Sequence, residues 1–301
     1  MKKYYHYAIV FAFAFNVLGA VAQNSSRMTT EPGSVVLNFH AAPSLTKISN
    51  SAYSDAVNAK AGFSGGVDAV YYFMSFKNMN IGVSLGLNYS YYSSGIKLNY
   101  SDSLWTVDAD GENVHLYEKG DRLSETQKLS AINVPVLLRF DYPLAGNFDM
   151  YLNAGMYVSM LVSKKYSTTM DYTARGYYPQ YNATLFNVDV ANSPYFYPTN
   201  KAMSSDGKLK LKSNIGMQMA LGCKYSISPV VALTAGINAC LGLSNMANNS
   251  GRVQPLVNSD REINSMAGKS GNTKANAFAF ELGISWKPAW LQKKKHPISG
   301  R

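Results

Sequence analysis

The sequence predicts an all-β protein: an eight-stranded antiparallel transmembrane β-barrel with short periplasmic turns and long extracellular loops. Three observations indicate this fold class. Only 15% of the 301 residues are charged while 47% are hydrophobic, hydrophobic residues alternate with small or polar ones in eight segments, and the gaps between these segments are alternately long and short. A soluble β-sandwich also alternates, but its outer faces must carry charge for contact with water.

The first residues are typical of a secretory signal peptide. A pair of lysines, a short apolar run and a small-residue cleavage motif fill residues 1–22. We therefore expect this segment to be removed and residues 23–33 to form a periplasmic N-terminal segment. Because no run of 18 apolar residues follows, a membrane role has to use strands.

Eight alternating segments predict the strands of the barrel. In the clearest one, Leu152, Met156 and Val158 share one face, while Asn153 and Ser159 share the other. The apolar faces of all eight carry no charged residue, and the opposite faces are mostly Gly, Ser, Asn, Thr and Ala. Lipid would contact the apolar face and small residues would fill a narrow lumen. The segments lie near residues 34–42, 61–75, 80–92, 128–142, 149–164, 209–225, 229–244 and 274–287.

The gaps between the segments predict the orientation of the barrel. Short gaps at 76–79, 143–148 and 226–228 are expected to be periplasmic turns. The barrel domain then spans residues 34–287, and an even strand count places a basic tail, residues 288–301, in the periplasm. The long gaps, expected to be extracellular loops, are 43–60, 93–127, 165–208 and 245–273.

Two details of the strands carry further expectations. Aromatic residues beside the short turns, such as Tyr71, Tyr151 and Trp286, are expected to form a girdle at the headgroup level. Pro135 lies in the middle of the fourth segment, where proline removes a hydrogen-bond donor from the ladder. We therefore expect a β-bulge at Pro135.

Two consecutive segments resemble a known family. Residues 132–140 read Ile-Asn-Val-Pro-Val-Leu-Leu-Arg-Phe, and residues 151–158 read Tyr-Leu-Asn-Ala-Gly-Met-Tyr-Val. This pair resembles the PorT-like outer-membrane β-barrel family of Bacteroidota, most strongly over 128–164. The resemblance implies a barrel in the cell outer membrane, and the founding member implies a part in type IX protein secretion. The long third loop and the tail beyond Trp286 depart from the family pattern.

Four charged residues are expected to face the lumen: Asp68, Arg139, Lys224 and Glu281. An isolated buried ion is costly, so we expect Arg139 and Lys224 to be balanced by Asp68 and Glu281 in a lumenal charge network. Eight strands enclose a space that side chains fill, which disfavours a general porin. A gate or proton path is the alternative interpretation of these charges.

The third long gap, 165–208, is rich in aromatic residues. Such residues are enriched at interfaces, so this loop is the candidate partner-binding segment. Packing over the mouth of the barrel is the alternative. The candidate residues are Tyr172, Tyr177, Tyr178, Tyr181, Phe186, Tyr195, Phe196 and Tyr197.

Catalytic and metal-binding motifs are weak in this sequence. His40 and His115 are the only loose candidates for a catalytic histidine, and no nucleophile motif accompanies them. Residues 108–113 have the oxygen spacing of the start of a calcium loop, but the later glutamate is missing. We therefore predict no enzyme activity, no cofactor and no metal.

The sequence as a whole predicts a non-enzymatic outer-membrane barrel that acts as a scaffold or partner-binding component, in protein secretion or another envelope complex. Its expected partners are outer-membrane lipid and another envelope protein, and an exported chain is not expected to meet nucleic acid. The alternative function is a surface ligand-binding or adhesin barrel that acts through the aromatic third loop. An outer-membrane enzyme is a third class, and it would lose turnover on substitution of His40 and His115.

Overall fold

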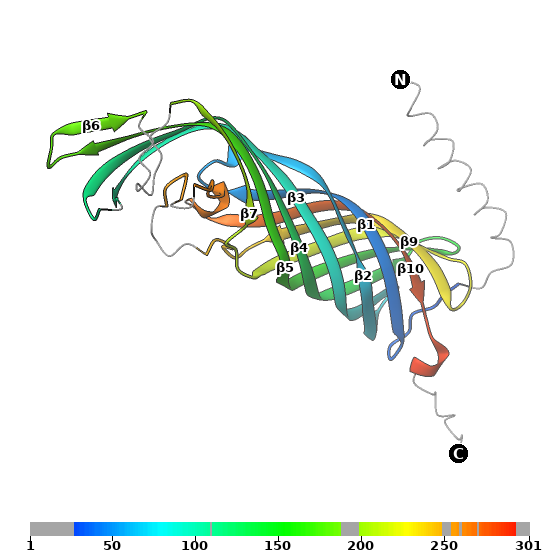
Figure 1. Cartoon of the computed structure of the whole chain (residues 1–301). Helices are drawn as coiled ribbons and strands as arrows, with labels where there is room; N and C mark the ends of the chain where they lie inside the picture. The colour runs from blue at the N-terminus through cyan, green and yellow to red at the C-terminus, as the bar shows by residue number, and fades with distance from the viewer. Residues whose placement is uncertain are drawn as a thin grey trace, which may run out of the picture.

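Eight antiparallel strands close into a ring, which confirms the predicted barrel (Figure 1). The computed structural model describes residues 27–108, 110–187, 199–248, 254–258, 261–269 and 271–292. The predicted signal peptide, 1–22, lies outside the described residues, as does most of the predicted tail. The ring strands are β1 (Val35–Asn50), β2 (Val57–Phe76), β3 (Met79–Val107), β4 (Asn113–Pro143), β5 (Phe148–Tyr178), β8 (Asn214–Ser226), β9 (Val231–Gly242) and β10 (Thr273–Trp286).

Neighbours in the ring follow the chain with one interruption. After β5 the chain forms β6 (Ala183–Phe186) and β7 (Lys201–Lys208), which pair with β5 outside the ring. It then returns to β8, and β10 closes the barrel against β1. No helix in the described part of the chain is long and apolar enough to cross a membrane.

The barrel is apolar outside and polar inside. On β4, Val136 is 53% exposed on the outer face, whereas the polar residues Asn133 and Arg139 are each 4% exposed and point into the lumen. Val136 pairs with Leu85 on one side and Met156 on the other, both exposed. This continuous outer band of apolar side chains matches the hydrocarbon layer of a membrane.

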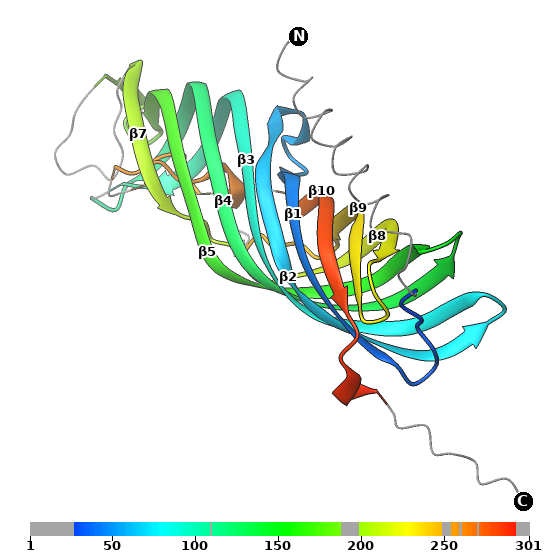
Figure 2. The same cartoon turned by 90° about the vertical axis from the view of Figure 1, so that its right-hand side faces the viewer.

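Three strands continue far beyond the apolar band and form what we call the wall. It consists of the second half of β3 (residues 93–107), the first half of β4 (residues 113–129), residues 163–178 of β5, and the added strands β6 and β7. Figures 1 and 2 show it rising from one side of the barrel end. The predicted loops 93–127 and 165–208 are therefore largely strands. Their alternation was hidden because the inner face includes the polar residues Glu118, Glu125 and Gln127.

The last long segment folds back against the wall. Residues 254–258 and 261–269, which we call the plug, place Leu256, Val257, Ile263 and Met266 in a buried cluster on the inner face of the wall. The plug is coloured orange in Figure 1, beside the mouth of the barrel. The described part of the predicted loop 245–273 therefore packs inward, because its apolar side chains are buried against the wall.

The segment that precedes β1 packs against the periplasmic end of the barrel. Met28 is buried against Val36, Val70, Tyr72 and Ala232 of the strands. Residues 27–34 thus lie against the lumen mouth and occupy the space that a channel entrance would need.

The bulge expected at Pro135 does not occur. The β4–β5 register runs without a shift from Ala131 to Pro143, and on the other side the pairs on either side of Pro135 keep one common register with β3. Gly86 of β3 lies opposite, and a Cβ added there would be 3.0 Å from the Pro135 ring. A glycine neighbour therefore accommodates the proline in place of an extra residue.

Candidate functional site

A buried ion cluster occupies the periplasmic half of the lumen. Asp141 accepts from Arg139 Nε at 2.6 Å and pairs with Lys224 Nζ at 2.7 Å. Lys224 is also 3.1 Å from Asp149, which in turn pairs with Arg27. Two cations of the strands thus share two carboxylates, and all four side chains are at most 6% exposed, so the charges largely compensate one another.

A second polar group lies deeper in the lumen. Asp68 accepts from Asn38 Nδ2 at 2.7 Å and lies 3.5 Å from His40 Nδ1. Glu281 accepts from Asn238 Nδ2 at 2.9 Å. These carboxylates are held by neutral side chains and an imidazole, so their partners differ from those of the ion cluster.

The expected pairing of Arg139 and Lys224 with Asp68 and Glu281 is therefore corrected. Arg139, Lys224 and Glu281 are buried, and Asp68 is half-buried, but within the described chain the ion partner that both cations share is Asp141. Asp141 shares the face of Arg139 two residues further along β4, and this spacing could have identified it. Period-two alternation assigns a face, but depth along the barrel depends on the register between strands.

Tyrosines complete the filling of the lumen. The Arg139 guanidinium lies 4.0 Å from the centre of the Tyr151 ring. Gly222 makes room for this ring, because an added Cβ would be 2.6 Å from it. Tyr151 is thus inside the barrel and not in the predicted girdle.

A cavity of about 10 Å³ between Thr46, Tyr92 and other residues has room for about one water molecule.

Two buried glutamates of the wall bind the plug. The Glu118 carboxylate accepts from the backbone N–H of Leu256 at 2.7 Å and lies 3.7 Å from Lys269 Nζ. Glu125 accepts from the backbone N–H of Met266 at 2.9 Å and from Ser265 Oγ at 2.7 Å. Burial raises the pKa of Glu118 above its ordinary range, although Lys269 and the backbone donors oppose this shift.

Removal of the Glu118 carboxylate should loosen the plug. In Glu118→Ala the amides of Leu256 and Val257 lose their buried acceptor, which costs about 1–3 kcal/mol for each unsatisfied group. We expect hydrogen exchange at residues 254–258 to accelerate at least about fivefold. Asp206→Ala, an exposed site on β7, is the control, and equal exchange in both variants would contradict the role of Glu118.

The pH dependence of the plug follows from the raised pKa of Glu118. A carboxyl whose pKa is higher when docked stabilises docking below its ordinary pKa, and this contribution is lost as the pH rises through the raised value. We expect exchange at 254–258, corrected for intrinsic rates, to show weaker protection at pH 7 than at pH 4. Glu118→Gln should remove that difference, and a retained difference would assign it to another group.

Aromatic side chains gather on the outer surface of the wall near its tip. Trp105 stacks on His115 with ring centres 4.6 Å apart, and His115 lies 4.4 Å from Tyr117. The Arg175 guanidinium lies 4.8 Å from the Tyr117 ring. The register places Tyr177 beside His115, and Phe186 beside Arg175. We call this group the aromatic face: Trp105, His115, Tyr117, Arg175, Tyr177 and Phe186.

The predicted loop residues separate into three groups. Tyr172 and Tyr178 are buried on the inner side of the wall, Tyr172 being 0% exposed, so the expectation that they contact a partner is corrected. Tyr177 and Phe186 belong to the aromatic face, and exposed Tyr181 at the β5–β6 turn donates to Glu112. Tyr195, Phe196 and Tyr197 lie outside the described residues.

Sequence reasoning missed four members of the aromatic face, because they fall in segments taken as loops. Trp105 is 62% exposed on β3, and His115 and Tyr117 stand at alternate positions of β4. Their spacing places both residues on one face. The register shift between Asp121 and Ser124 reverses the phase of the alternation relative to the membrane part of β4, so extrapolation from that part would have assigned the two residues to the inner face.

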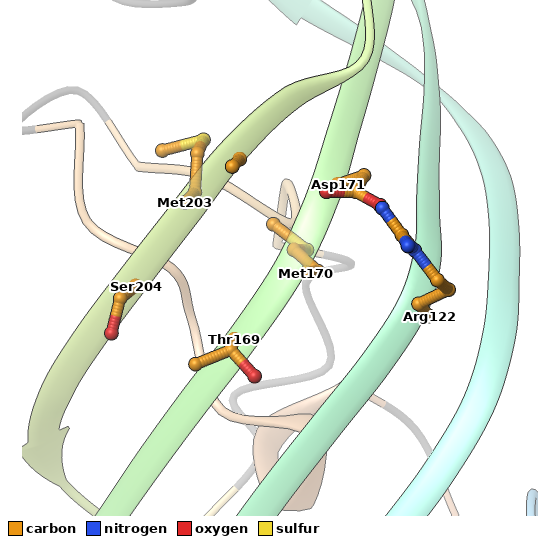
Figure 3. A pocket seen from close by; sticks show the side chains of 7 residues that line it. Arg122, Thr169, Met170, Asp171, Met203 and Ser204 are labelled. Atoms are coloured by element: carbon orange, nitrogen blue, oxygen red, sulfur yellow. The ribbon is translucent and has the colours of Figure 1, made fainter.

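A shallow pocket of about 400 Å³ lies between β4, β5 and β7 (Figure 3). In Figure 3 the Arg122 and Asp171 side chains point toward each other, and Arg122 Nε donates to Asp171 at 2.6 Å. Met170 and Met203 supply the apolar part of the lining. Because its charges neutralise each other, this pocket presents no free charged group to a ligand.

The loose catalytic and calcium candidates do not assemble into a site. His40 faces the lumen beside Asp68, whereas His115 is on the outer surface of the wall. Asp108 accepts from the backbone N–H groups of Asp110 and Glu112, which closes the β3–β4 turn. Among the described residues no group of His, Cys, Asp or Glu has the arrangement of a metal site.

Comparisons with known proteins point to the outer membrane. The family model described as "Outer membrane protein beta-barrel domain" matches residues 21–248, and no curated protein matches the sequence. Neisserial surface protein A is similar at 13% identity, covering 84% of this chain and 97% of its own, with a TM-score of 0.32. OprG from Pseudomonas aeruginosa is 11% identical over 87% and 99%, with a TM-score of 0.35. Ail of Yersinia pestis is 9% identical over 85% and 100%, with a TM-score of 0.27.

Proposed function

The chain belongs to the outer membrane protein beta-barrel domain family, and we propose that it is a non-enzymatic scaffold whose wall binds another envelope protein. Its place is the cell outer membrane, where the apolar band contacts lipid. The lumen holds buried ion pairs and tyrosines, and residues of the segment before β1 pack into its periplasmic end. Passage of solutes through the barrel would need an open lumen, so we assign the function to the outer surfaces of the molecule.

The observation that supports this proposal is the exposed aromatic face on the wall. Trp105 and Phe186 are 62% and 67% exposed beyond the membrane band. Isolated aromatics on a surface need no explanation, but five aromatic rings around one arginine form a contiguous patch. Trp, Tyr and Arg are the residues that most often carry the binding energy of protein interfaces.

The PorT-like pattern of β4 and β5 favours a protein-secretion assembly as the envelope complex. That pattern includes Arg139, which the ion cluster uses to fix the lumen. In this proposal the barrel holds the wall at a fixed position in the membrane, and the wall contacts the other envelope protein.

A matched pair of double variants tests the proposal. The test variant, Trp105→Ala with Phe186→Ala, removes the two most exposed aromatic rings of the aromatic face. The control variant, Phe76→Ala with Trp290→Ala, also removes one exposed Phe and one exposed Trp, but near the periplasmic end. After cross-linking in intact cells and purification from outer membranes, we expect the first variant to lose its co-eluting protein at least about tenfold, given the usual energies of such residues. Equal recovery with both variants would reject the wall as the contact site.

A surface ligand-binding or adhesin role is the second candidate. The exposed side chains of Tyr181 and Phe186 at the tip of the wall favour it. The isolated segment 165–208 is not a suitable probe, because Tyr172 and Tyr178 belong to the core of β5. The purified whole barrel is the correct one: binding of a soluble ligand without any other envelope protein would favour this role over the scaffold.

A further inference from the structure

Five exposed lysines form a cluster on the outside of the barrel, just beyond the apolar band. Lys128 of β4 lies directly opposite Lys165 of β5, which lies opposite Lys208 of β7. Lys210 and Lys212 follow in the segment that leads to β8. We call these five residues the lysine belt, and Figure 2 shows β4, β5 and β7 side by side where it lies.

The core of the protein fixes the outward direction of these lysines. Leu209 and Leu211 alternate with Lys208, Lys210 and Lys212 and are buried in an internal cluster. Leu129, the neighbour of Lys128, is buried in the same cluster. A change of direction for the lysines would expose these leucines, so the belt is a rigid feature of the surface.

The belt is electrostatically unfavourable as it stands. Like charges directly opposite each other on neighbouring strands destabilise a sheet, and here three ammonium groups stand in one row. Within the described chain no ion pair joins any of the five to a carboxylate. The acidic residue on β7, Asp206, is exposed one row further from the membrane. An external anion would relieve this repulsion.

The height of the belt matches the headgroup layer of the outer leaflet. Exposed Val162 lies three residues before Lys165 on β5, and exposed Ile215 lies three residues after Lys212. Between the apolar band and the belt, the hydroxyl of exposed Tyr89 donates to Ser130 at 2.9 Å. Tyrosine at this level is typical of a membrane–water interface. An anion bound here would have apolar side chains directly below it.

We propose that the lysine belt binds the phosphate groups of a phosphorylated lipid in the outer leaflet. Ammonium groups are strong donors to phosphate oxygens, and the acyl chains would lie along Val162 and Ile215. A soluble anion would use the charges but not the apolar surface beneath them. This inference rests on the placement of the barrel in the outer membrane and is independent of the partner proposed for the wall.

Lipid selectivity measured by electron spin resonance tests the belt. The full chain is reconstituted in phosphatidylcholine vesicles that contain spin-labelled phosphatidic acid or spin-labelled phosphatidylcholine. We expect the protein to immobilise phosphatidic acid several-fold more strongly. In the double variant Lys165→Gln with Lys208→Gln this preference should fall by about fivefold at low salt, to near equality of the two lipids, and the corresponding arginine variant should retain it.

The control is a double variant higher on the same wall. Lys97→Gln with Lys119→Gln removes the same charge outside the belt, and the preference should survive. Equal losses in both double variants would assign the effect to net charge and overturn the proposal. Release of the labelled lipid by low concentrations of inorganic phosphate would assign the belt to a soluble anion and would also overturn it.

Discussion

Asp141→Ala should lower the free energy of unfolding by about 3–5 kcal/mol, the usual cost of removing one partner of a buried ion pair. The expected effect is large because the carboxylate serves two cations at once, Arg139 at 2.6 Å and Lys224 at 2.7 Å. Neither cation can reach water from its buried position. Urea titration of the reconstituted barrel, followed by tryptophan fluorescence, measures the change.

Two further variants give this prediction its control. Asp206→Ala removes an exposed carboxylate of the same chain and should change stability by less than about 0.5 kcal/mol. Asp141→Ala combined with Lys224→Met should recover part of the loss, because one uncompensated charge disappears with its partner. A single variant as stable as the original barrel would show that the ion cluster is not essential for the lumen.

Val136→Arg should destabilise the barrel by about 2–4 kcal/mol, the cost of an arginine near the bilayer midplane on the lipid face. Val136 is exposed and lies between the exposed residues Leu85 and Met156. An arginine there would replace an apolar contact with lipid by a charge. The same urea titration in vesicles measures the difference.

Ser204→Arg is the matched substitution on the outer surface of the wall. Ser204 is exposed on β7 beyond the apolar band, so its replacement should cost less than about 0.5 kcal/mol. If both arginines were tolerated equally in vesicles, the apolar band would not be in contact with hydrocarbon. That result would contradict the orientation of the whole barrel.

The membrane part of the fold could be predicted from the sequence, and the wall could not. In strands such as β8, Ile215, Met219 and Leu221 face lipid while small or polar residues alternate with them, so each face has its own composition. In the wall both faces mix polar and apolar residues, because the inner face has Glu118 and Glu125 to bind the plug. Periodicity in hydrophobicity disappears where a buried carboxylate has a structural partner.

The candidate sites show the same limit. Alternation assigned Asp68, Arg139, Lys224 and Glu281 to one kind of face, and in the structure three of them are buried and Asp68 bonds to buried Asn38. It could not pair them, because pairing depends on the register of strands far apart in sequence. For the aromatic residues the limit was different. Tyr172 and Tyr177 are five residues apart in a strand and therefore lie on opposite faces of β5. These faces can be assigned only once residues 165–178 are known to continue the strand.

The seam between β1 and β10 has a consequence for the order of assembly. Residues 37–50 pair with 273–286, so the first and last strands of the ring are the ones that join. Until Thr273–Trp286 arrives, β1 and β9 each present an unpaired edge that other chains can join, and such distant contacts form slowly. The interval before ring closure is therefore the most aggregation-prone stage in the maturation of this protein, and a factor that shields those edges would act then.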